Sequence, residues 1–308
     1  MNEVFKVLNK YYGYNTFRKG QYEIISNILR GRDSFCILPT GGGKSICYQI
    51  PALLFKGITI VISPLISLMK DQVDNLNSNG INARYINSTQ RLELSDEIIE
   101  LCKRGEVKLL YIAPEKLENE FFKRKLRALN ISQIAIDEAH CVSMWGHDFR
   151  KSYREIAPFI NSLSNRPVIT AFTATATEVV REDIIKLLEL RNPYKYFGSF
   201  DRDNLIISVH IEEDKLEFVK DIIRENEGNA GIIYCATRKE VDGLYYYLKD
   251  LGYDVGKYHG GLKDNEKVYY QEEFLKENIN VMIATNAFGM GIDKPNVRYI
   301  LHFTIPKN

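Results

Sequence analysis

"LPTGGGKSICYQIP", residues 38–51, places three consecutive glycines, a lysine and a serine between an apolar run and a segment of helical character. Residues without Cβ adopt positive φ, so such a loop lets backbone N–H groups surround an anion where a helix begins. Lys44 would then reach the β- and γ-phosphates of a nucleotide, and the Ser45 hydroxyl would bind Mg²⁺. Leu38 replaces the first glycine of the strict phosphate-loop pattern, so a flexible turn stays an alternative for this segment alone. The candidate nucleotide ligands are Thr40, Gly41, Gly42, Gly43, Lys44 and Ser45.

A second polar segment, "IAIDEAH" at residues 134–140, ends another apolar run with two acids. Ligands of parallel α/β sheets bind at the carboxyl ends of the strands. Asp137 can hold Mg²⁺ directly or through water, and Glu138 can polarise the water that attacks the γ-phosphate. A solvated loop would also hold two acids, but an acid that ends a buried strand needs a partner. The two segments predict an ATP-hydrolysing site with Mg²⁺, in which Lys44, Asp137 and Glu138 are catalytic.

Short β-branched runs alternate with longer amphipathic segments around these two motifs. We expect strands at residues 34–38, 58–62, 108–112, 133–137 and 167–172, and helices at 67–80, 90–105, 115–129 and 178–190. This alternation is typical of an α/β fold with a parallel sheet covered by helices on both faces.

The alternation pauses at residues 191–205, a stretch rich in aromatic and turn-forming residues that we interpret as a connection between domains. It resumes with expected strands at residues 205–210, 230–235, 254–259, 279–284 and 297–303. We therefore expect a first α/β domain over residues 1–197, a linker over 198–205 and a second α/β domain over 206–308.

The composition is typical of two ordinary globular domains and does not indicate a particular binding partner. The 308 residues are 45% hydrophobic, and 41 basic against 40 acidic residues give a net charge of +1, so any nucleic-acid site must be local. The five cysteines lack C-x-x-C spacing, which predicts reduced, mostly buried thiols and neither disulfides nor zinc. The absence of a long apolar run and of a secretory pattern at the start of the sequence predicts a cytoplasmic location.

The pairing of "PTGGGKS" with "DEAH" resembles superfamily-two helicases, and the neighbouring strings resemble the RecQ family of DNA helicases. They cover nearly the whole chain: "YGYNTFRKGQ" (12–21), "SPLISLMKDQ" (63–72), "YIAPEKL" (111–117), "DEAHCVSMWGHDFR" (137–150), "FTATAT" (172–177), "GIIYCATR" (231–238), "YHGGL" (258–262) and "IATNAFGMGIDKPNVR" (283–298). The resemblance implies two tandem RecA-like domains with a nucleotide cleft between them. It also implies 3′-to-5′ translocation on single-stranded DNA, unwinding of partially duplex DNA in repair and recombination, and a monomer.

The resemblance also assigns further nucleotide contacts. Tyr14 and Arg18 are expected to sandwich the adenine, while the Gln21 amide reads the edge of the base. Asp293, behind a glycine-containing loop, is expected near the nucleotide and the cleft. Within "FTATAT", Thr175 or Thr177 can also serve as the N-cap of the following helix.

DNA contacts are expected in two places. Ser63 follows an apolar run and offers a hydroxyl to a DNA phosphate. The loop "CVSMWGHDFR" mixes aromatic rings with a cation, which suits unpaired bases, and the resemblance gives it the coupling of DNA to ATP hydrolysis. Burial of its aromatic rings in the core is the alternative. Met144 and Lys151 depart from the residues frequent in the family without removing a stacking or charged group. The candidate DNA ligands are Ser63, Trp145, His147, Phe149 and Arg150.

Two other functions stay open. A DEAD-box-like RNA helicase would use the same ATP-hydrolysing site. In this sequence, however, "CVSMWGHDFR" replaces the segment that follows the acidic motif in that family. A nucleotide- and nucleic-acid-binding fragment without turnover is the other, because the sequence reaches Asn308 before the arginine-rich closing motif of the family. We expect a chain that lacks this motif to bind ATP, Mg²⁺ and some single-stranded DNA but to hydrolyse slowly and not to unwind duplexes.

Overall fold

The computed structural model describes residues 3–87, 90–146, 148–199, 204–211, 214–288, 294 and 296–305, apart from the side chain of Ser67. The chain divides into two compact units, Met1–Arg202 and Asp203–Asn308. This division falls within the expected linker at 198–205, of which residues 200–203 lie outside the described part. In the ranges given above, no helix is long and apolar enough to span a membrane.

The first unit contains a seven-stranded sheet in the order β3-β4-β2-β5-β6-β1-β7, with parallel pairing throughout. Its two edge strands, β3 and β7, were not among the expected strands, because each mixes charged residues with apolar ones and leaves part of its surface exposed. The interpretation of residues 194–197 as part of a connecting segment is therefore wrong. The strands are β1 (Ser34–Ile37), β2 (Ile58–Ile62), β3 (Ala83–Ile86), β4 (Leu109–Ile112), β5 (Ile131–Ile136), β6 (Val168–Thr173) and β7 (Tyr194–Phe197).

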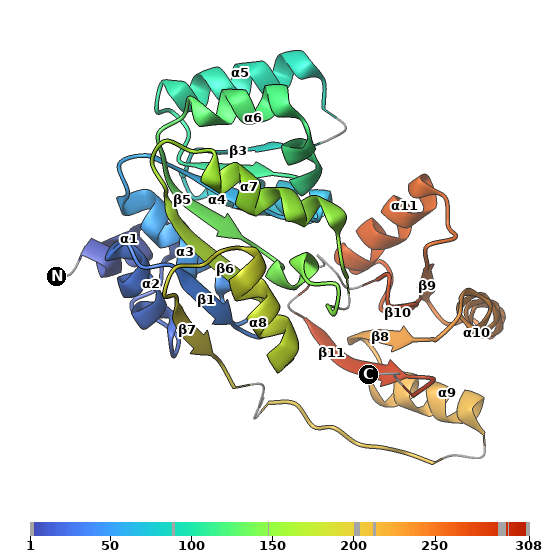
Figure 1. Ribbon diagram of the computed structural model, residues 1–308. Helices are drawn as coiled ribbons and strands as arrows, with labels where there is room; N and C mark the ends of the chain where they lie inside the picture. Colours follow the sequence, from blue (N-terminus) through green and yellow to red (C-terminus); the bar gives the residue numbers. More distant parts are fainter. Residues whose placement is uncertain are drawn as a thin grey trace. The chain divides into compact units, whose positions relative to one another are not determined.

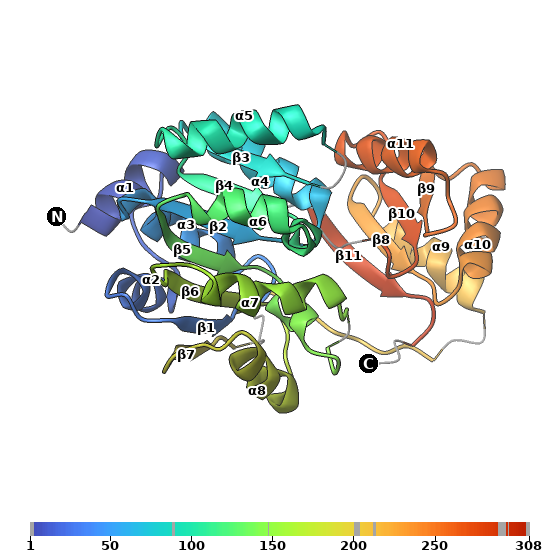
Figure 2. The same cartoon turned by 45° about the horizontal axis from the view of Figure 1, so that its top comes forward.

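Helices cover both faces of this sheet, as the alternation predicted (Figure 1, Figure 2). Successive strand side chains point to opposite faces, so Phe35 and Ile37 join one core cluster while Cys36 joins the other. The Cys36 side packs against α2 (Gln21–Leu29), α3 (Lys44–Leu54) and α4 (Ile66–Ser78), with α1 (Glu3–Tyr12) packed on α3. The opposite side packs against α5 (Leu92–Lys103), α6 (Glu120–Arg127), α7 (Ile156–Asn161) and α8 (Glu178–Leu187).

The helix expected at residues 115–129 is divided in two. A 3₁₀ turn, η1 (Pro114–Glu118), is followed by α6, and the Asn119 side chain between them accepts a hydrogen bond from the Phe122 N–H. Asparagine competes with helical hydrogen bonds in a helix interior but favours an N-cap, which explains the break. Two more 3₁₀ turns, η2 (Ala139–Val142) and η3 (Lys151–Glu155), follow β5 and shape the predicted site.

The second unit contains a four-stranded parallel sheet in the order β11-β8-β10-β9. Its strands are β8 (Ala230–Tyr234), β9 (Val255–Tyr258), β10 (Val281–Ala284) and β11 (Val297–His302). Helices α9 (Lys215–Glu225) and α10 (Arg238–Asp250) pack on one face and α11 (Asp264–Leu275) on the other. The two units thus have the tandem α/β architecture of RecA-like helicase domains.

The strand expected at residues 205–210 is wrong. Residues 205–211 have no regular secondary structure, and Ile206 and Ile207 are 97% and 90% exposed. A β-branched run forms a strand only when a neighbour completes its ladder, and no strand in the described part pairs with this one. The five cysteines are buried, which confirms their expected burial.

Candidate nucleotide-binding site

The glycine-rich loop connects the end of β1 to the first residue of α3, Lys44. Gly41 and Gly43 have φ values of 73° and 77°, a left-handed conformation that residues with a Cβ rarely adopt. A Cβ on Gly43 would also lie 2.3 Å from Gln21 Nε2. The loop therefore has a defined conformation at a helix N-terminus, which is an arrangement suited to binding a phosphate.

Two residues hold this loop: Gln21, the first residue of α2, and Arg18, which precedes the helix. The Gln21 side chain is buried; its Oε1 accepts from the Arg18 N–H at 2.9 Å, and its Nε2 donates to the Gly43 carbonyl at 3.2 Å. The Arg18 guanidinium donates to the Gly41 carbonyl, while Tyr14 is 55% exposed. Adenine recognition by these three residues stays a prediction. A positioning role for Gln21 was missed, because the sequence alone does not show that α2 reaches the loop.

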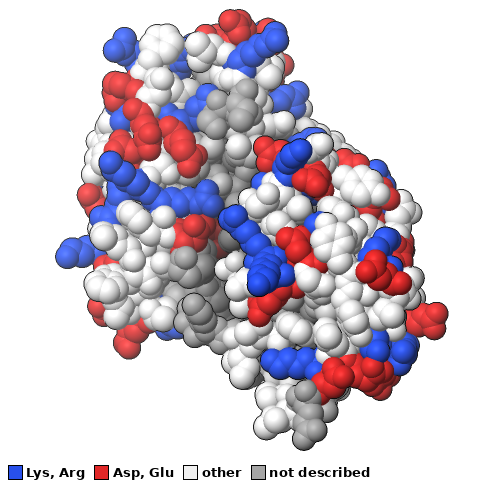
Figure 3. All heavy atoms as spheres, turned by 90° about the vertical axis from the view of Figure 1, so that its right-hand side faces the viewer, with Lys and Arg blue, Asp and Glu red and all other residues white. Residues whose placement is uncertain are grey.

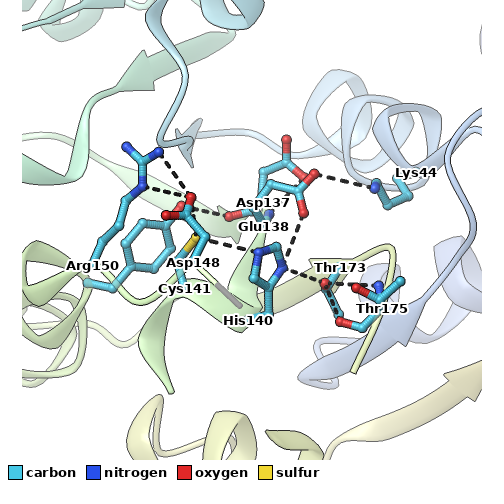
Figure 4. A network of polar contacts seen from close by, with 10 residues as sticks. Lys44, Asp137, Glu138, His140, Cys141, Asp148, Arg150, Thr173 and Thr175 are labelled. Atoms are coloured by element: carbon cyan, nitrogen blue, oxygen red, sulfur yellow. Dashed lines mark hydrogen bonds and ion pairs between the residues drawn. The ribbon is translucent and has the colours of Figure 1, made fainter. Parts of the chain in front are cut away.

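Asp137 and Glu138 follow the last residue of β5, and the sheet brings them to the phosphate loop. Lys44 Nζ lies 3.6 Å from Glu138 Oε1 (Figure 4). Asp137 is buried, and its backbone N–H donates to the Ile62 carbonyl at 2.9 Å. Glu138 has φ 45° and ψ 47°, a left-handed conformation that is costly for a residue with a Cβ. The three predicted catalytic residues therefore lie together at the carboxyl edge of one sheet.

The electrostatics of the acid pair favour a bound cation. Burial and, after it, the Glu138 charge raise the pKa of Asp137 to about 6, whereas the Lys44 ammonium acts in the opposite direction. Two adjacent carboxyl groups in a desolvated site gain from a hard cation, and Mg²⁺ prefers oxygen ligands. Ser45 supplies a hydroxyl in the first turn of α3, beside Lys44. The residues present therefore fit a magnesium ion shared with nucleotide phosphates.

His140 connects the acid pair to the segment after β6. Its Nδ1 lies 3.3 Å from Glu138 Oε2 and 2.8 Å from the Thr173 hydroxyl, which in turn donates to the Thr175 carbonyl at 3.0 Å (Figure 4). The role of Thr177 as an N-cap is confirmed, since its side chain accepts from the Val180 N–H at the start of α8. His140 was not among the predicted site residues, although it closes the "DEAH" string.

The contacts continue from His140 into the loop of residues 141–150. Cys141 Sγ lies 3.7 Å from His140 Nε2 and 3.9 Å from Asp148 Oδ2. Arg150 donates to Asp148 Oδ2 from Nε and Nη2, at 3.1 and 3.0 Å, and from Nη1 to the Pro64 carbonyl at 2.9 Å. A continuous chain of polar contacts thus joins Lys44 to Arg150 (Figure 4).

The aromatic side chains of this loop are at the surface. Trp145 is 76% exposed, so its burial in the core is excluded, and Phe149 is 39% exposed with the Arg154 guanidinium 5.6 Å from its ring centroid. His147 and Asp293 lie outside the described residues. Ser63 is 2% exposed, and its hydroxyl has no hydrogen-bond partner within the described part. A contact between Ser63 and DNA stays a prediction that requires this hydroxyl to become accessible.

Basic and acidic side chains are mixed on the surface, in agreement with their nearly equal numbers in the sequence. Lys and Arg side chains are interspersed with Asp and Glu on the face drawn in Figure 3. Recognition of a polyanion therefore depends on particular side chains.

A glycine loop and an acid pair at the carboxyl edge of a parallel sheet define the class of RecA-like nucleotide-binding proteins. Residues 18–183 match the DEAD/DEAH box helicase family, and residues 214–308 match the helicase conserved C-terminal domain. The chain belongs to the DEAD/DEAH box helicase family. It is a RecQ-type helicase core.

Similar proteins support the same grouping. The ATP-dependent DNA helicases RecQ of Bacillus subtilis and Haemophilus influenzae are 51% and 43% identical over 98% of the chain. The match spans 51% and 49% of those proteins, so the chain has about half the length of these curated relatives.

Solved helicase structures share the fold. Saccharomyces cerevisiae Dbp5 bound to RNA and ADP BeF3 has a TM-score of 0.75 at 19% identity, over 99% of this chain and 79% of that one. The DUF1998 helicase MrfA bound to DNA and AMPPNP has a TM-score of 0.80 at 18% identity, over 99% and 47%. At these identities the likeness extends to the fold alone.

Proposed function

We propose that the chain is the motor core of an ATP-dependent DNA helicase that moves 3′ to 5′ along single-stranded DNA and separates duplexes in repair and recombination. The observation that carries this proposal is the chain of contacts from Lys44 through Glu138, His140 and Asp148 to Arg150, next to an exposed tryptophan. Nucleotide chemistry and DNA contact therefore share one polar network.

Each residue of the nucleotide site has a separate task. The backbone N–H groups of the loop and Lys44 bind the phosphates, and Glu138 orients the attacking water. Asp137 and Ser45 would hold Mg²⁺, which neutralises charge on the phosphate oxygens when bound. Because Lys44 now lies beside Glu138, the arrival of a phosphate gives Lys44 a stronger partner and frees Glu138 for water.

The loop of residues 141–150 supplies the DNA response. Exposed Trp145 and Phe149 offer faces for stacking on unpaired bases, which tolerates any base sequence. A shift of this loop on binding DNA is transmitted through Asp148 and Cys141 to His140, which contacts Glu138. DNA thereby controls the position of the residue that orients water.

Two variants test the division of roles. Lys44→Ala removes the phosphate-binding cation, so both ATP binding and hydrolysis should be lost. Glu138→Gln keeps the shape of the side chain, so ATP should still bind while turnover stops. Binding of a fluorescent ATP analogue and phosphate release measure the two effects. Failure of the Glu138→Gln variant to bind nucleotide, with its melting temperature unchanged, would contradict the assignment.

A further inference from the structure

A cluster of basic residues lies at the amino ends of the strands of the first sheet, opposite the candidate nucleotide-binding site. A pocket of about 450 Å³ lies beside the amino ends of β1, β6 and β7, and its lining includes Arg30, Arg32, Arg166 and Arg191. The phosphate loop follows the carboxyl end of β1, so the four residues of that strand, about 13 Å at the usual rise, separate the two places. The proposed nucleotide mechanism does not use this pocket.

Asp33, the one acid among the described residues that line the pocket, is fully engaged within the protein. Its side chain is 3% exposed and pairs with Arg166 at 3.0 and 2.6 Å, one distance from each guanidinium nitrogen. It also accepts from the backbone N–H groups of Ile169 and Arg191, at 3.0 and 2.7 Å. Asp33 therefore neutralises Arg166 and connects the starts of three strands, so among the described residues of the lining no carboxylate remains for the other arginines.

The remaining three arginines are exposed and available to a ligand. Arg32 is oriented, since its Nε donates to the Asn192 carbonyl at 3.1 Å and its guanidinium lies 5.9 Å from the Tyr194 ring centroid. In the part of the chain that the structure describes, no acid pairs with the side chains of Arg30 or Arg191. Among the described residues of the lining, four positive charges thus accompany one negative charge, an excess of three at one concave site.

We propose that this pocket binds a polyphosphate anion. Guanidinium groups present several N–H donors in a plane and bind phosphate oxygens in pairs. Three of them line this pocket without an acid partner among the residues that the structure describes. The pocket volume is within the range of small-ligand sites. The phosphate groups can belong to a free polyphosphate or to a nucleic-acid backbone, because both present the same oxygens.

Calorimetric titration with pyrophosphate tests the proposal. The Lys44→Ala background removes the phosphate-loop site, so the pyrophosphate binding that remains should report the pocket. Adding Arg30→Ala and Arg191→Ala should weaken that binding at least about tenfold. The matched control adds Arg104→Ala and Arg124→Ala, two exposed arginines elsewhere in the same unit, and should leave the binding unchanged.

The outcomes separate this proposal from the helicase function. Equal binding with and without the pocket arginines, an equal loss in the control, or no binding in the Lys44→Ala background would overturn it. With Lys44 intact, Arg30→Ala/Arg191→Ala should bind the ATP analogue normally, so the nucleotide site is tested independently. Displacement of pyrophosphate by a short DNA duplex would identify a nucleic-acid backbone as the source, and its retention would identify a free polyphosphate.

Discussion

At the scale of single residues, Asp137 is a predicted catalytic residue whose ionisation lowers the stability of the folded chain. Its pKa of about 6 in the folded chain exceeds the value of about 3.9 for an unperturbed aspartate. The folded state therefore holds the proton more tightly than the unfolded state does. The stabilisation is fully present below about pH 4 and is lost as the pH rises through 6.

The Asp137→Asn variant tests this linkage in the absence of nucleotide and Mg²⁺. Asparagine stays neutral at every pH, so its free energy of unfolding should rise relative to that of the native chain between pH 4 and pH 7, with the change centred between about 4 and 6. Urea unfolding at a series of pH values measures the difference. A difference that stays constant across this range would show that Asp137 is ionised throughout.

Trp145 allows a second test at the same scale, because it is the single tryptophan of the chain. Its exposed ring should emit as a solvated indole, and single-stranded DNA should quench that emission by stacking. Trp145→Ala should weaken DNA binding by about 1–3 kcal/mol and remove the DNA response of ATP hydrolysis. The melting temperature should stay the same, since the ring is not in the core. A melting temperature many degrees lower would instead make Trp145 a structural residue.

At the scale of elements, Asp33 joins the starts of β1, β6 and β7. Asp33→Asn should destabilise the first unit by about 3–5 kcal/mol, because it leaves the Arg166 charge without its partner and turns an amide toward backbone donors. Glu106→Gln, in an exposed pair with Arg104, is the control and should change stability by less than about 1 kcal/mol. Chemical unfolding compares them. Equal effects would show that Asp33 does not stabilise this edge.

The elements that the sequence predicted are those with a strong apolar pattern. β2, β5 and β6 are buried runs, whereas β7 at the sheet edge alternates with exposed residues and was taken for a connection. Residues 205–210 have the pattern of a strand without a partner in the described part. Local pattern reports how apolar a segment is, while pairing depends on neighbours that are distant in sequence.

The same limit applies to the candidate site. Lys44, Asp137 and Glu138 could be predicted because each follows a recognisable strand, and parallel strands end at one edge. The contacts of Gln21 with the loop and of His140 with Thr173 depend on packing between segments, so they could not be predicted from the motifs alone. Asp33 and its arginines carry no motif, and only the folded sheet brings them together.

At the scale of the whole molecule, we propose that DNA contact controls ATP hydrolysis. The first unit holds the phosphate loop, the acid pair and the exposed tryptophan, so the proposed coupling would act within one compact unit. Stimulation of ATP hydrolysis by DNA would distinguish a DNA helicase from an RNA helicase with the same nucleotide site. It would also distinguish it from a binding protein without turnover.

The test is the rate of phosphate release by the 308-residue chain with Mg²⁺-ATP, alone, with single-stranded DNA, and with RNA of the same base sequence. We predict that hydrolysis is slow, that DNA raises its rate, that RNA does not, and that Glu138→Gln removes hydrolysis under all three conditions. Stimulation by RNA but not by DNA would rule out a DNA motor, and hydrolysis that persists in the Glu138→Gln variant would rule out Glu138 as the residue that orients water.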